Sequence, residues 1–570
     1  MKKTIILLLI MSFLLFFSMY LFAGLPVAQS TKIQKSITDI EKENELREKL
    51  EKEKVKPTIE QPALEEAPPM PGESKVMVKD ITVIGVTLIT QEEISKIIQP
   101  YQNKELAVRE MQKVADLITD AYRKKGYITS RAYLPPQKLE AGSLEIRVME
   151  GMTGEIYIKD NRYFKSALYR NKIRLKNGQP FNYESLRKGL SKINQLPDRS
   201  AKAVITPGKA PGTTDVVLEV KERLPIHIGF DYDNYGSRYI DNDRVRTTLT
   251  HNNLLGFDDI FNFQYQLAEG ENYRLLSLRY LFPLTESLKL GFFAADSKLD
   301  LQKELEASNA RGKSRLYSIF LTQSLISKEN VSLDFNLGFD YKDSFNFQNN
   351  LETSRDRMRI AKSSLDLDLT DSLGRTIINN EVSFGIPDIM SGLHAVDSRS
   401  SRSGAGGEFF KDNLDILRLQ KLPFNATLLW KNQFQFTSDI LTASEQFQIG
   451  GIINVRGYPA AEVVGDRGAS MVWELSMPPY FVPKNIKVPF SKAKLYDAFR
   501  IVTFYDWATA HLKRPALTEE ENKTLRASGF GFRLNLPEDF SCRVEFAWPL
   551  DNSPSDGENP HIWTEVSKSF

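Results

Sequence analysis

Residue types that commonly carry catalysis occur in this 570-residue chain, but their spacing does not form an active site. The GKS string at 312–314 lacks the first glycine of a phosphate-binding loop, because Ala307 stands in its place. The glycines at 404–407 lie in a Ser/Gly-rich stretch without a strand-to-helix pattern, which indicates a flexible loop. The five histidines show no metal-ligand spacing, and Cys542 is the single cysteine. We therefore expect no enzyme activity, no metal site and no cofactor.

Composition narrows the class of protein further. Lys plus Arg total 75 and Asp plus Glu total 73, so no strong net charge points to a nucleic-acid partner. The hydrophobic fraction of 41% is too low for a helical membrane protein, but it suits a β-barrel, in which alternate residues face lipid. The 34 phenylalanines and 21 tyrosines could supply the aromatic girdles of such a barrel.

Apolar and polar side chains alternate with a period of two through residues 224–570. The alternation is clearest at 331–341, 365–369 and 541–548. Such segments are long enough, or nearly so, to cross a bilayer as tilted strands of roughly 9 to 11 residues. Their acidic faces suit a water-filled lumen. At roughly 22 residues per strand and connection, residues 224–570 predict a transmembrane antiparallel β-barrel of about 16 strands.

The C-terminus agrees with this prediction. Ile562, Thr564 and Val566 lead with a period of two to Phe570, the last residue. A terminal aromatic residue on the final strand is a common insertion signal of outer-membrane barrels. We expect Phe570 to serve as that signal.

The first 28 residues predict export. Lys2 and Lys3 precede an apolar run that ends near Ala23, and small residues follow. This order of charge, apolar core and small residues is that of a secretory signal peptide, cleaved after Ala23 or Ala28. The run could also just span a bilayer as a permanent anchor. The cleaved signal is the favoured interpretation.

Two connecting segments follow the signal. Residues 29–56 are rich in charge, and the stretch from about 30 to 56 has no Gly or Pro and places isoleucines at helical spacing. A helix of this length would measure about 38 Å, close to the thickness of a membrane, although a solvated helix would show the same composition. Residues 57–74 hold five prolines and predict an extended, semi-rigid linker.

Residues 75–151 and 152–223 each predict a compact α+β module with the element order β-α-α-β-β. The two modules form an internal repeat in pattern, although not in letters. In each module one helix carries an apolar face. These faces consist of Met111, Val114, Ile118 and Tyr122 in the first module, and of Leu186, Leu190 and Ile193 in the second.

The most specific string lies at 449–474, which reads IGGIINVRGYPAAEVVGDRGASMVWE. Its centre resembles the inward-folding loop signature of the outer-membrane polypeptide-transport superfamily. The resemblance implies that the motif lies at the tip of a loop tucked inside the barrel. The motif residues are Val455, Arg456, Gly457 and Tyr458.

The same resemblance implies that Arg456 faces an acidic residue on the inner barrel wall. The matching acid is Asp506, within the sequence FYDWA at 504–508. The planar fork of an arginine suits a carboxylate, and an arginine held away from bulk water is costly to leave unpaired. Gly457 would allow a tight turn that a Cβ would block. The family pattern usually ends in Gly where this chain has Ala508, which puts the local geometry in question.

The N-terminal modules at 75–151 and 152–223 indicate the same superfamily. Residues 126–151 and 194–220 resemble the first and second polypeptide-transport-associated (POTRA) domains of two-partner secretion transporters. This is the TpsB-type family of haemolysin-activator and filamentous-haemagglutinin transporters. The likeness spans about residues 75–570.

Membership would imply a transporter of the bacterial outer membrane with its N-terminal domains in the periplasm. It would bind an unfolded exoprotein (a TpsA-type adhesin, cytolysin or toxin) and secrete it through the barrel pore without nucleotide hydrolysis. The helix at 29–56 would plug the resting pore. Outer-membrane lipids and the barrel-assembly machinery would be further partners.

Three alternatives share some of these features. A barrel-assembly insertase belongs to the same superfamily, but the two-module front end and the PPQKL and PGKAPG segments argue against it. A plugged nutrient receptor needs about 22 strands, more than the residues after 224 supply. A simple diffusion porin would have no use for residues 75–222.

Overall fold

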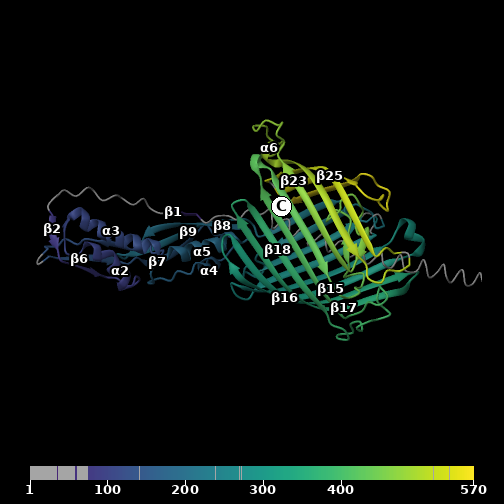
Figure 1. Cartoon of the computed structure of the whole chain (residues 1–570), viewed down its shortest axis with the longest axis horizontal. Coiled ribbons are helices and arrows are strands. Elements are labelled where there is room, and N and C mark those ends of the chain that lie inside the picture. The colour runs from purple at the N-terminus through teal and green to yellow at the C-terminus, as the bar shows by residue number, and fades with distance from the viewer. Residues whose placement is uncertain are drawn as a thin grey trace, which may run out of the picture. The chain divides into compact units, whose positions relative to one another are not determined.

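The computed structural model (Figure 1) describes most of the chain from residue 75 onward. The predicted signal peptide, the N-terminal helix apart from Lys35, which is helical, and the linker apart from β1 lie outside the described residues. No helix in the described part is long and apolar enough to cross a membrane. The described residues are Lys35, Thr58–Glu60, 75–139, 142–237, 239–268, 270, 272–517, 519–537 and 539–570.

The first module packs α3 against a three-stranded sheet of order β3-β6-β5, with β2 and β4 paired beside it. The predicted helical face of α3 is buried in the core of this module. Thr90 and Glu93 form a capping box that starts α2. The elements are β2 (Lys75–Val78), β3 (Asp80–Ile84), α2 (Gln91–Ile98), η1 (Gln99–Tyr101), β4 (Lys104–Ala107), α3 (Val108–Lys124), β5 (Arg131–Tyr133) and β6 (Ser143–Met149).

The second module has its own core, formed by α4 and α5 on a sheet of order β1-β8-β9-β7. The predicted apolar face of α5 is buried there. Its elements are β7 (Met152–Lys159), α4 (Ser166–Lys172), α5 (Tyr183–Asn194), β8 (Arg199–Pro207) and β9 (Thr213–Glu222).

A glutamate at the end of the last strand organises a loop in each module. Glu150 accepts hydrogen bonds from the backbone of Thr87 (2.7 Å) and Leu88 (2.9 Å) and from the hydroxyl of Tyr122 (2.7 Å). Burial raises the pKa of the Glu150 carboxyl, but these donors lower it by more, so its pKa lies below the ordinary value.

In the second module Glu222 makes the equivalent contacts. It accepts from the backbone of Arg162 (2.7 Å) and Tyr163 (2.5 Å) and from the hydroxyl of Tyr169 (2.5 Å). The internal repeat therefore includes a glutamate that accepts a hydrogen bond from a helix tyrosine in each module.

Within the predicted extended linker, Thr58–Glu60 form strand β1, a pairing that the sequence did not predict. It pairs in parallel with Lys202–Val204 of β8 and so covers that edge of the second module's sheet. Lys202 ties the pairing by bonding Glu60 (3.1 Å) and Glu219 (2.9 Å).

The region after residue 225 forms a closed antiparallel barrel of 16 strands, which confirms the predicted fold. The three alternating segments lie within β16, β17 and β26. The strands are β10 (Ile226–Asp233), β11 (Arg244–His251), β12 (Ile260–Ala268), β13 (Tyr273–Pro283), β14 (Leu288–Asp300), β15 (Arg311–Ser327), β16 (Val331–Gln348), β17 (Leu351–Asp371), β18 (Gly374–Gly385), β19 (Phe409–Lys421), β20 (Thr427–Phe436), β23 (Arg467–Met477), β24 (Phe499–His511), β25 (Asn522–Leu536), β26 (Phe540–Pro549) and β27 (His561–Ser569).

The barrel presents apolar side chains outward and polar ones inward. In β24, Tyr505 is exposed on the outer face, whereas Phe504 and Asp506 are buried on the inner face. We call the end of the barrel where β10 begins the N-terminal rim, and the other end the distal rim. Because successive strands run in opposite directions, the connections lie alternately at the two rims. The first connection, between β10 and β11, lies at the distal rim, and the second, between β11 and β12, lies at the N-terminal rim.

The barrel closes where β10 meets β27. Five residue pairs join the two strands, from Gly229 with Ser569 to Asp233 with Glu565. The backbone of Phe570 extends this seam, because it donates to the Ile228 carbonyl (2.9 Å) and accepts from the Ile228 amide (3.2 Å). The ring of Phe570 lies 6.5 Å from that of Phe230. Its role as an insertion signal stays a prediction.

The connection between β20 and β23, residues 437–466, starts from the distal rim and packs against the inner wall. It contains a small hairpin of β21 (Phe447–Ile449) and β22 (Val463–Gly465). Ile449, Val455 and Tyr458 from this connection share a buried cluster with wall residues of β24 and β25. We call residues 437–466 the inward loop.

Candidate functional site in the barrel lumen

The structure brings Arg456 and Asp506 together. The Arg456 guanidinium donates from Nε to Oδ2 (2.9 Å) and from Nη2 to Oδ1 (2.8 Å) of Asp506, and its backbone amide also donates to Oδ2 (3.0 Å). Both side chains are almost fully buried. This two-point contact uses the planar fork of arginine and fixes both the position and the orientation of the motif.

Two further carboxylates complete the site. Arg456 Nη1 donates to Glu474 of β23 and to Glu545 of β26, each at 3.0 Å. The guanidinium carbon also lies 3.4 Å from the centre of the Phe504 ring. One loop arginine is thus held by acids from three wall strands rather than by Asp506 alone.

Wall arginines balance the charge of these acids. Arg533 donates to both oxygens of Glu474 (2.6 and 2.8 Å) and to Glu545 (2.5 Å). Arg543 donates to Glu565 of β27 (2.7 Å). Buried ions need such partners, because an unpaired charge removed from water is strongly unfavourable.

Gly457 lies flush against the wall. A Cβ at this position would lie 2.8 Å from the backbone nitrogen of Pro549 and 2.9 Å from the Cβ of Ala527. The structure has the predicted tight turn, in which the Tyr458 amide donates to the Val455 carbonyl (3.3 Å). Close approach to β25 and β26 is a second reason for a glycine at this position. The indole of Trp563 fixes the neighbouring backbone by donating to the Arg456 carbonyl (2.7 Å).

The other two motif residues form the apolar side of the site. Val455 and Tyr458 are buried against Ala508, Ala510 and Ala527 of the wall. The wall therefore accommodates Ala508 within a floor of small side chains. The departure from the family's glycine does not prevent the contact between Arg456 and Asp506.

A second anchor holds the inward loop to the other strands of the wall. Glu445 accepts from Lys342 of β16 (2.8 Å) and Lys411 of β19 (2.5 Å). Lys35 also interacts electrostatically with Glu445. The loop is therefore braced between β16 and β19 at one end and β23, β24 and β26 at the other.

The distal rim carries a third group of contacts. Buried Asp466 accepts from Arg402 (2.5 Å), from the backbone of Leu441 (2.8 Å) and from the backbone of Lys513 (2.7 Å). These bonds join the connections 386–408, 437–466 and 512–521. The connection 386–408 includes the predicted flexible glycine stretch.

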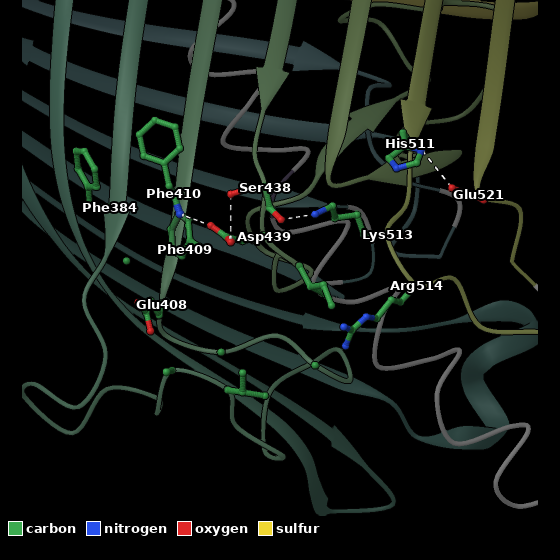
Figure 2. Close-up of a pocket in the computed structure, with 16 residues that line it drawn as sticks. Phe384, Glu408, Phe409, Phe410, Ser438, Asp439, His511, Lys513, Arg514 and Glu521 are labelled. Carbon is green, nitrogen blue, oxygen red and sulfur yellow. Dashed lines mark hydrogen bonds and ion pairs between the residues drawn. The ribbon is translucent and has the colours of Figure 1, made fainter.

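Figure 2 shows a pocket between these connections. In it Asp439 accepts from the Phe410 amide (2.7 Å), Lys513 contacts the Ser438 carbonyl, and His511 lies near Glu521. The lining mixes aromatic and charged side chains without a nucleophile-base arrangement among the residues shown.

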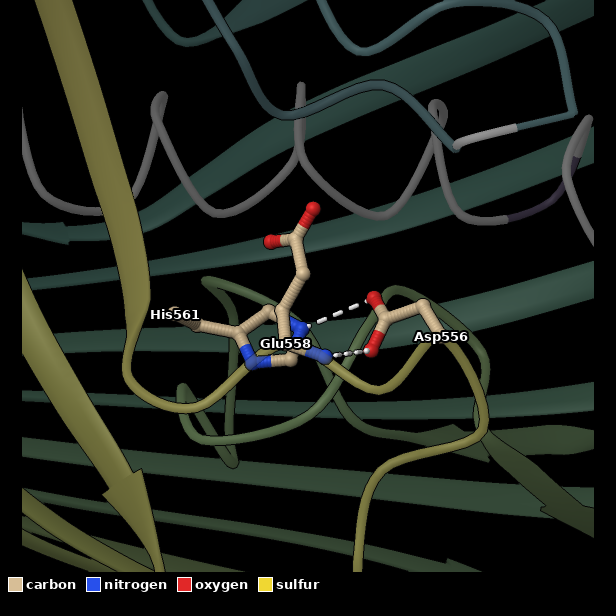
Figure 3. A group of neighbouring side chains, drawn as sticks. All are labelled: Asp556, Glu558 and His561. Atoms are coloured by element: carbon tan, nitrogen blue, oxygen red, sulfur yellow. Dashed lines mark hydrogen bonds and ion pairs between the residues drawn. The ribbon is translucent and has the colours of Figure 1, made fainter.

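The structure also brings Asp556 and Glu558, of the connection between β26 and β27, close to His561, the first residue of β27 (Figure 3), with potential ligand atoms within 4.8 Å of one another. The His561 Nε2 atom bonds Asp556 at 2.9 Å, and the ring stacks on Trp563 at 5.8 Å. These contacts account for the histidine as a structural residue beside the Arg456 site.

The predicted residues Val455, Arg456, Gly457, Tyr458 and Asp506 therefore lie together in the lumen, whereas Phe570 lies apart at the seam. Sequence reasoning missed the remaining members of the site. The charged members could be seen only as polar residues at inward positions of alternating strands, and Phe504 and Trp563 are aromatic residues that do not carry this signal. The missed residues are Glu474, Phe504, Arg533, Arg543, Glu545, Trp563 and Glu565.

Comparison with known proteins agrees with this architecture. Residues 212–493 match the family described as haemolysin secretion/activation protein ShlB/FhaC/HecB. Residues 76–151 match the ShlB-type POTRA domain.

Individual relatives cover most of the chain. The heme/hemopexin transporter protein HuxB of Haemophilus influenzae is 22% identical over 499 residues, which is 85% of each chain. The outer membrane transporter CdiB of Escherichia coli is 24% identical over 417 residues, covering 71% of this chain and 70% of CdiB.

A solved structure of CdiB from Escherichia coli has a TM-score of 0.69 at 20% identity, and the match covers 96% of this chain and 99% of that chain. At this identity the likeness concerns the fold. Family membership rests on the matches of residues 212–493 and 76–151. The protein is a member of the haemolysin secretion/activation family, an outer-membrane transporter of the two-partner secretion type with periplasmic POTRA domains.

Proposed function

We propose that this transporter passes an unfolded exoprotein outward through its lumen, and that passage requires the inward loop to be fixed by Arg456. The supporting observation is the contact of one buried loop arginine with carboxylates from three wall strands. These strands belong to the wall whether or not the loop is docked. The contact therefore sets where the loop lies in the lumen without contributing to the strand ladders.

The exoprotein is proposed to be a TpsA-type adhesin, cytolysin or toxin. It would dock on the POTRA domains as an added strand, because backbone hydrogen bonds give affinity with tolerance of sequence. The sheet of the second domain ends in β1 on one side and β7 on the other. A partner strand can add to β7, or it can reach β8 by displacing the three residues of β1.

Transport is proposed to proceed without nucleotide hydrolysis. The exoprotein would thread the lumen and fold outside the cell. Folding would then prevent its return, because a folded domain cannot re-enter the pore. The helix at 29–56 is proposed to plug the resting pore, and the interaction of Lys35 with Glu445 of the inward loop supports this.

Two further partners are proposed for the barrel. Outer-membrane lipids would surround its apolar outer face. The barrel-assembly machinery would insert it, with Phe570 at the closing seam as the recognised end of the last strand.

Removing the transporter from cells that express its exoprotein tests the main proposal. The expected result is loss of exoprotein from the medium and cell surface, while other outer-membrane barrels assemble at normal levels. Restoring the full chain should restore secretion. Unchanged secretion would refute the proposal, and a general loss of outer-membrane barrels would favour the insertase instead.

A further inference from the structure

The connection between β23 and β24, residues 478–498, is much longer than the other turns of the N-terminal rim. Those turns have two to eight residues between strands. Hydrogen bonds from the Val488 amide to the Ala493 carbonyl (3.0 Å) and from the Leu495 amide to the Ile486 carbonyl (2.8 Å) shape it into a small hairpin. The hairpin leads into α6 (Leu495–Ala498) and stands out from the barrel beside the ends of β23 and β24 (Figure 1).

This connection exposes aromatic side chains that the described part of the chain does not cover. Tyr480 is 51% exposed, Phe481 79% and Phe490 fully exposed at the hairpin tip. Phe490 has a φ of 62°, a left-handed conformation that bulky residues rarely adopt. In the adjacent turn Phe424 is 83% exposed, and Tyr480 donates to its carbonyl (3.1 Å). Exposed apolar groups in this number mark a contact surface.

The same connection is basic. Lys484, Lys487, Lys492 and Lys494 are exposed, and Asp497 is the single acid, so four positive charges less one negative charge leave +3. Lys484 lies over the ring of Tyr496 at 5.2 Å. Among the described residues none of the four lysines forms an ion pair with a carboxylate. Their charge is therefore available to an anionic partner.

The wall beside the connection carries an aromatic belt. Trp430 and Trp473 stack at 5.6 Å, and Phe499 and Phe532 stack at 5.8 Å, all near the ends of strands at the N-terminal rim. Trp473 is 40% exposed on the outer face. Aromatic residues at such positions mark the boundary between lipid and water. The connection thus leaves the wall at the level of the lipid headgroups of the periplasmic leaflet.

We propose that residues 478–498 bind anionic phospholipids of the periplasmic leaflet and anchor this rim to the membrane. Exposed aromatic residues next to lysines are suited to this interface, because rings enter the headgroup region while ammonium groups meet phosphates. The excess of positive charge selects anionic over zwitterionic headgroups. An exported polypeptide is less well matched, since its route lies in the lumen and the connection stands on the outer side of the wall.

A fluorescent probe at the hairpin tip tests the proposal. The full chain carrying Cys542→Ser and Phe490→Cys is labelled with an environment-sensitive dye and placed in nanodiscs of phosphatidylethanolamine, alone or mixed with phosphatidylglycerol. We expect a blue shift of the emission and quenching by headgroup-level spin-labelled lipid, both larger with phosphatidylglycerol. Replacing the four lysines by glutamine should remove the difference between the two lipid mixtures.

A label at Leu517, an exposed residue of the distal connection 512–521, is the matched control and should not respond to the lysine substitutions. Retention of the heat-dependent gel shift verifies that each variant is a folded barrel. Emission at residue 490 that is independent of phosphatidylglycerol or of the lysines would overturn the proposal. So would a probe that stays in water in both mixtures and responds only to an added N-terminal fragment of the exoprotein.

Discussion

Replacing Arg456 by alanine should stop secretion and leave the barrel intact. Among the described residues, Arg456 is the one side-chain donor to Asp506, whereas Glu474 and Glu545 also have Arg533. The substitution therefore removes that donor from Asp506. The inner site holds three arginines and the four acids Glu474, Asp506, Glu545 and Glu565, so its formal charge changes from −1 to −2. The lost charge balance is therefore concentrated at one buried carboxylate.

The size of the effect follows from this geometry. Leaving one partner of a buried ion pair unpaired costs about 3 to 5 kcal/mol. If the cost falls on docking of the inward loop, the ratio of docked to undocked loop decreases by roughly a hundred- to several-thousandfold. The strand ladders of β23 to β27 do not involve Arg456 and keep all their hydrogen bonds. Secretion should therefore fall steeply while the barrel persists.

The assay compares exoprotein in the culture medium with the heat-dependent gel shift of the barrel. Asp506→Ala should be milder than Arg456→Ala, because Arg456 would retain Glu474 and Glu545. Exchanging the charges, with Arg456→Asp and Asp506→Arg, should not restore secretion, since the new carboxylate would face those two glutamates. Near-normal secretion by Arg456→Ala would refute the reasoning, and loss of the barrel would make the residue structural.

Four other perturbations test separate parts of the structure. Gly457→Ala should reduce secretion with an intact barrel, because the Cβ of the alanine would collide with the backbone of Pro549. Normal secretion would show that the barrel wall can shift to accommodate this Cβ. Deleting residues 30–56 should raise single-channel conductance in planar bilayers, and unchanged conductance would leave this segment as a spacer. Ile59→Pro should weaken β1 and increase binding of an exoprotein N-terminal fragment to residues 54–225, measured by calorimetry; weaker binding would contradict displacement of β1. Glu150→Gln should lower the melting temperature of the same fragment at pH 7. Because the folded pKa is depressed, this difference should persist above the unfolded pKa of about 4.3 and shrink as the pH falls through the lower folded value; a constant difference would exclude the carboxylate as its cause.

The barrel could be predicted from the sequence because its signal is local. In a strand that separates lipid from water, apolar and polar side chains alternate residue by residue. A segment such as 331–341 can therefore be predicted as a strand from its own residues alone. The apolar face of α3 is a signal of the same kind, repeated every turn.

The site could be predicted only in part, because its residues are distant in the sequence and meet only through the register of the paired barrel strands. Arg456 and Asp506 are 50 residues apart and were matched through a family motif. Glu545 is 89 residues from Arg456, and its inward position is shared with many other polar residues of the wall. Strand β1 was missed for a similar reason, since three residues between prolines give no pattern and the pairing partner Lys202 is 142 residues from Glu60.

The seam between β10 and β27 has a consequence for how the barrel folds. Its ladder holds five residue pairs, fewer than any other ladder of the barrel, and joins residues such as Asp231 and Ser567 that are 336 positions apart. The chain entropy lost on closing a loop of that length is about 5 kcal/mol by the logarithmic scaling of loop closure. Every hairpin of the barrel closes a far shorter loop and can form earlier. Closure through successive hairpins therefore avoids most of this entropy cost, because each pairing brings the two ends of the sheet closer together. The seam is then the last ladder to pair, and the backbone pairing of Phe570 with Ile228 lies where the final hydrogen bonds form.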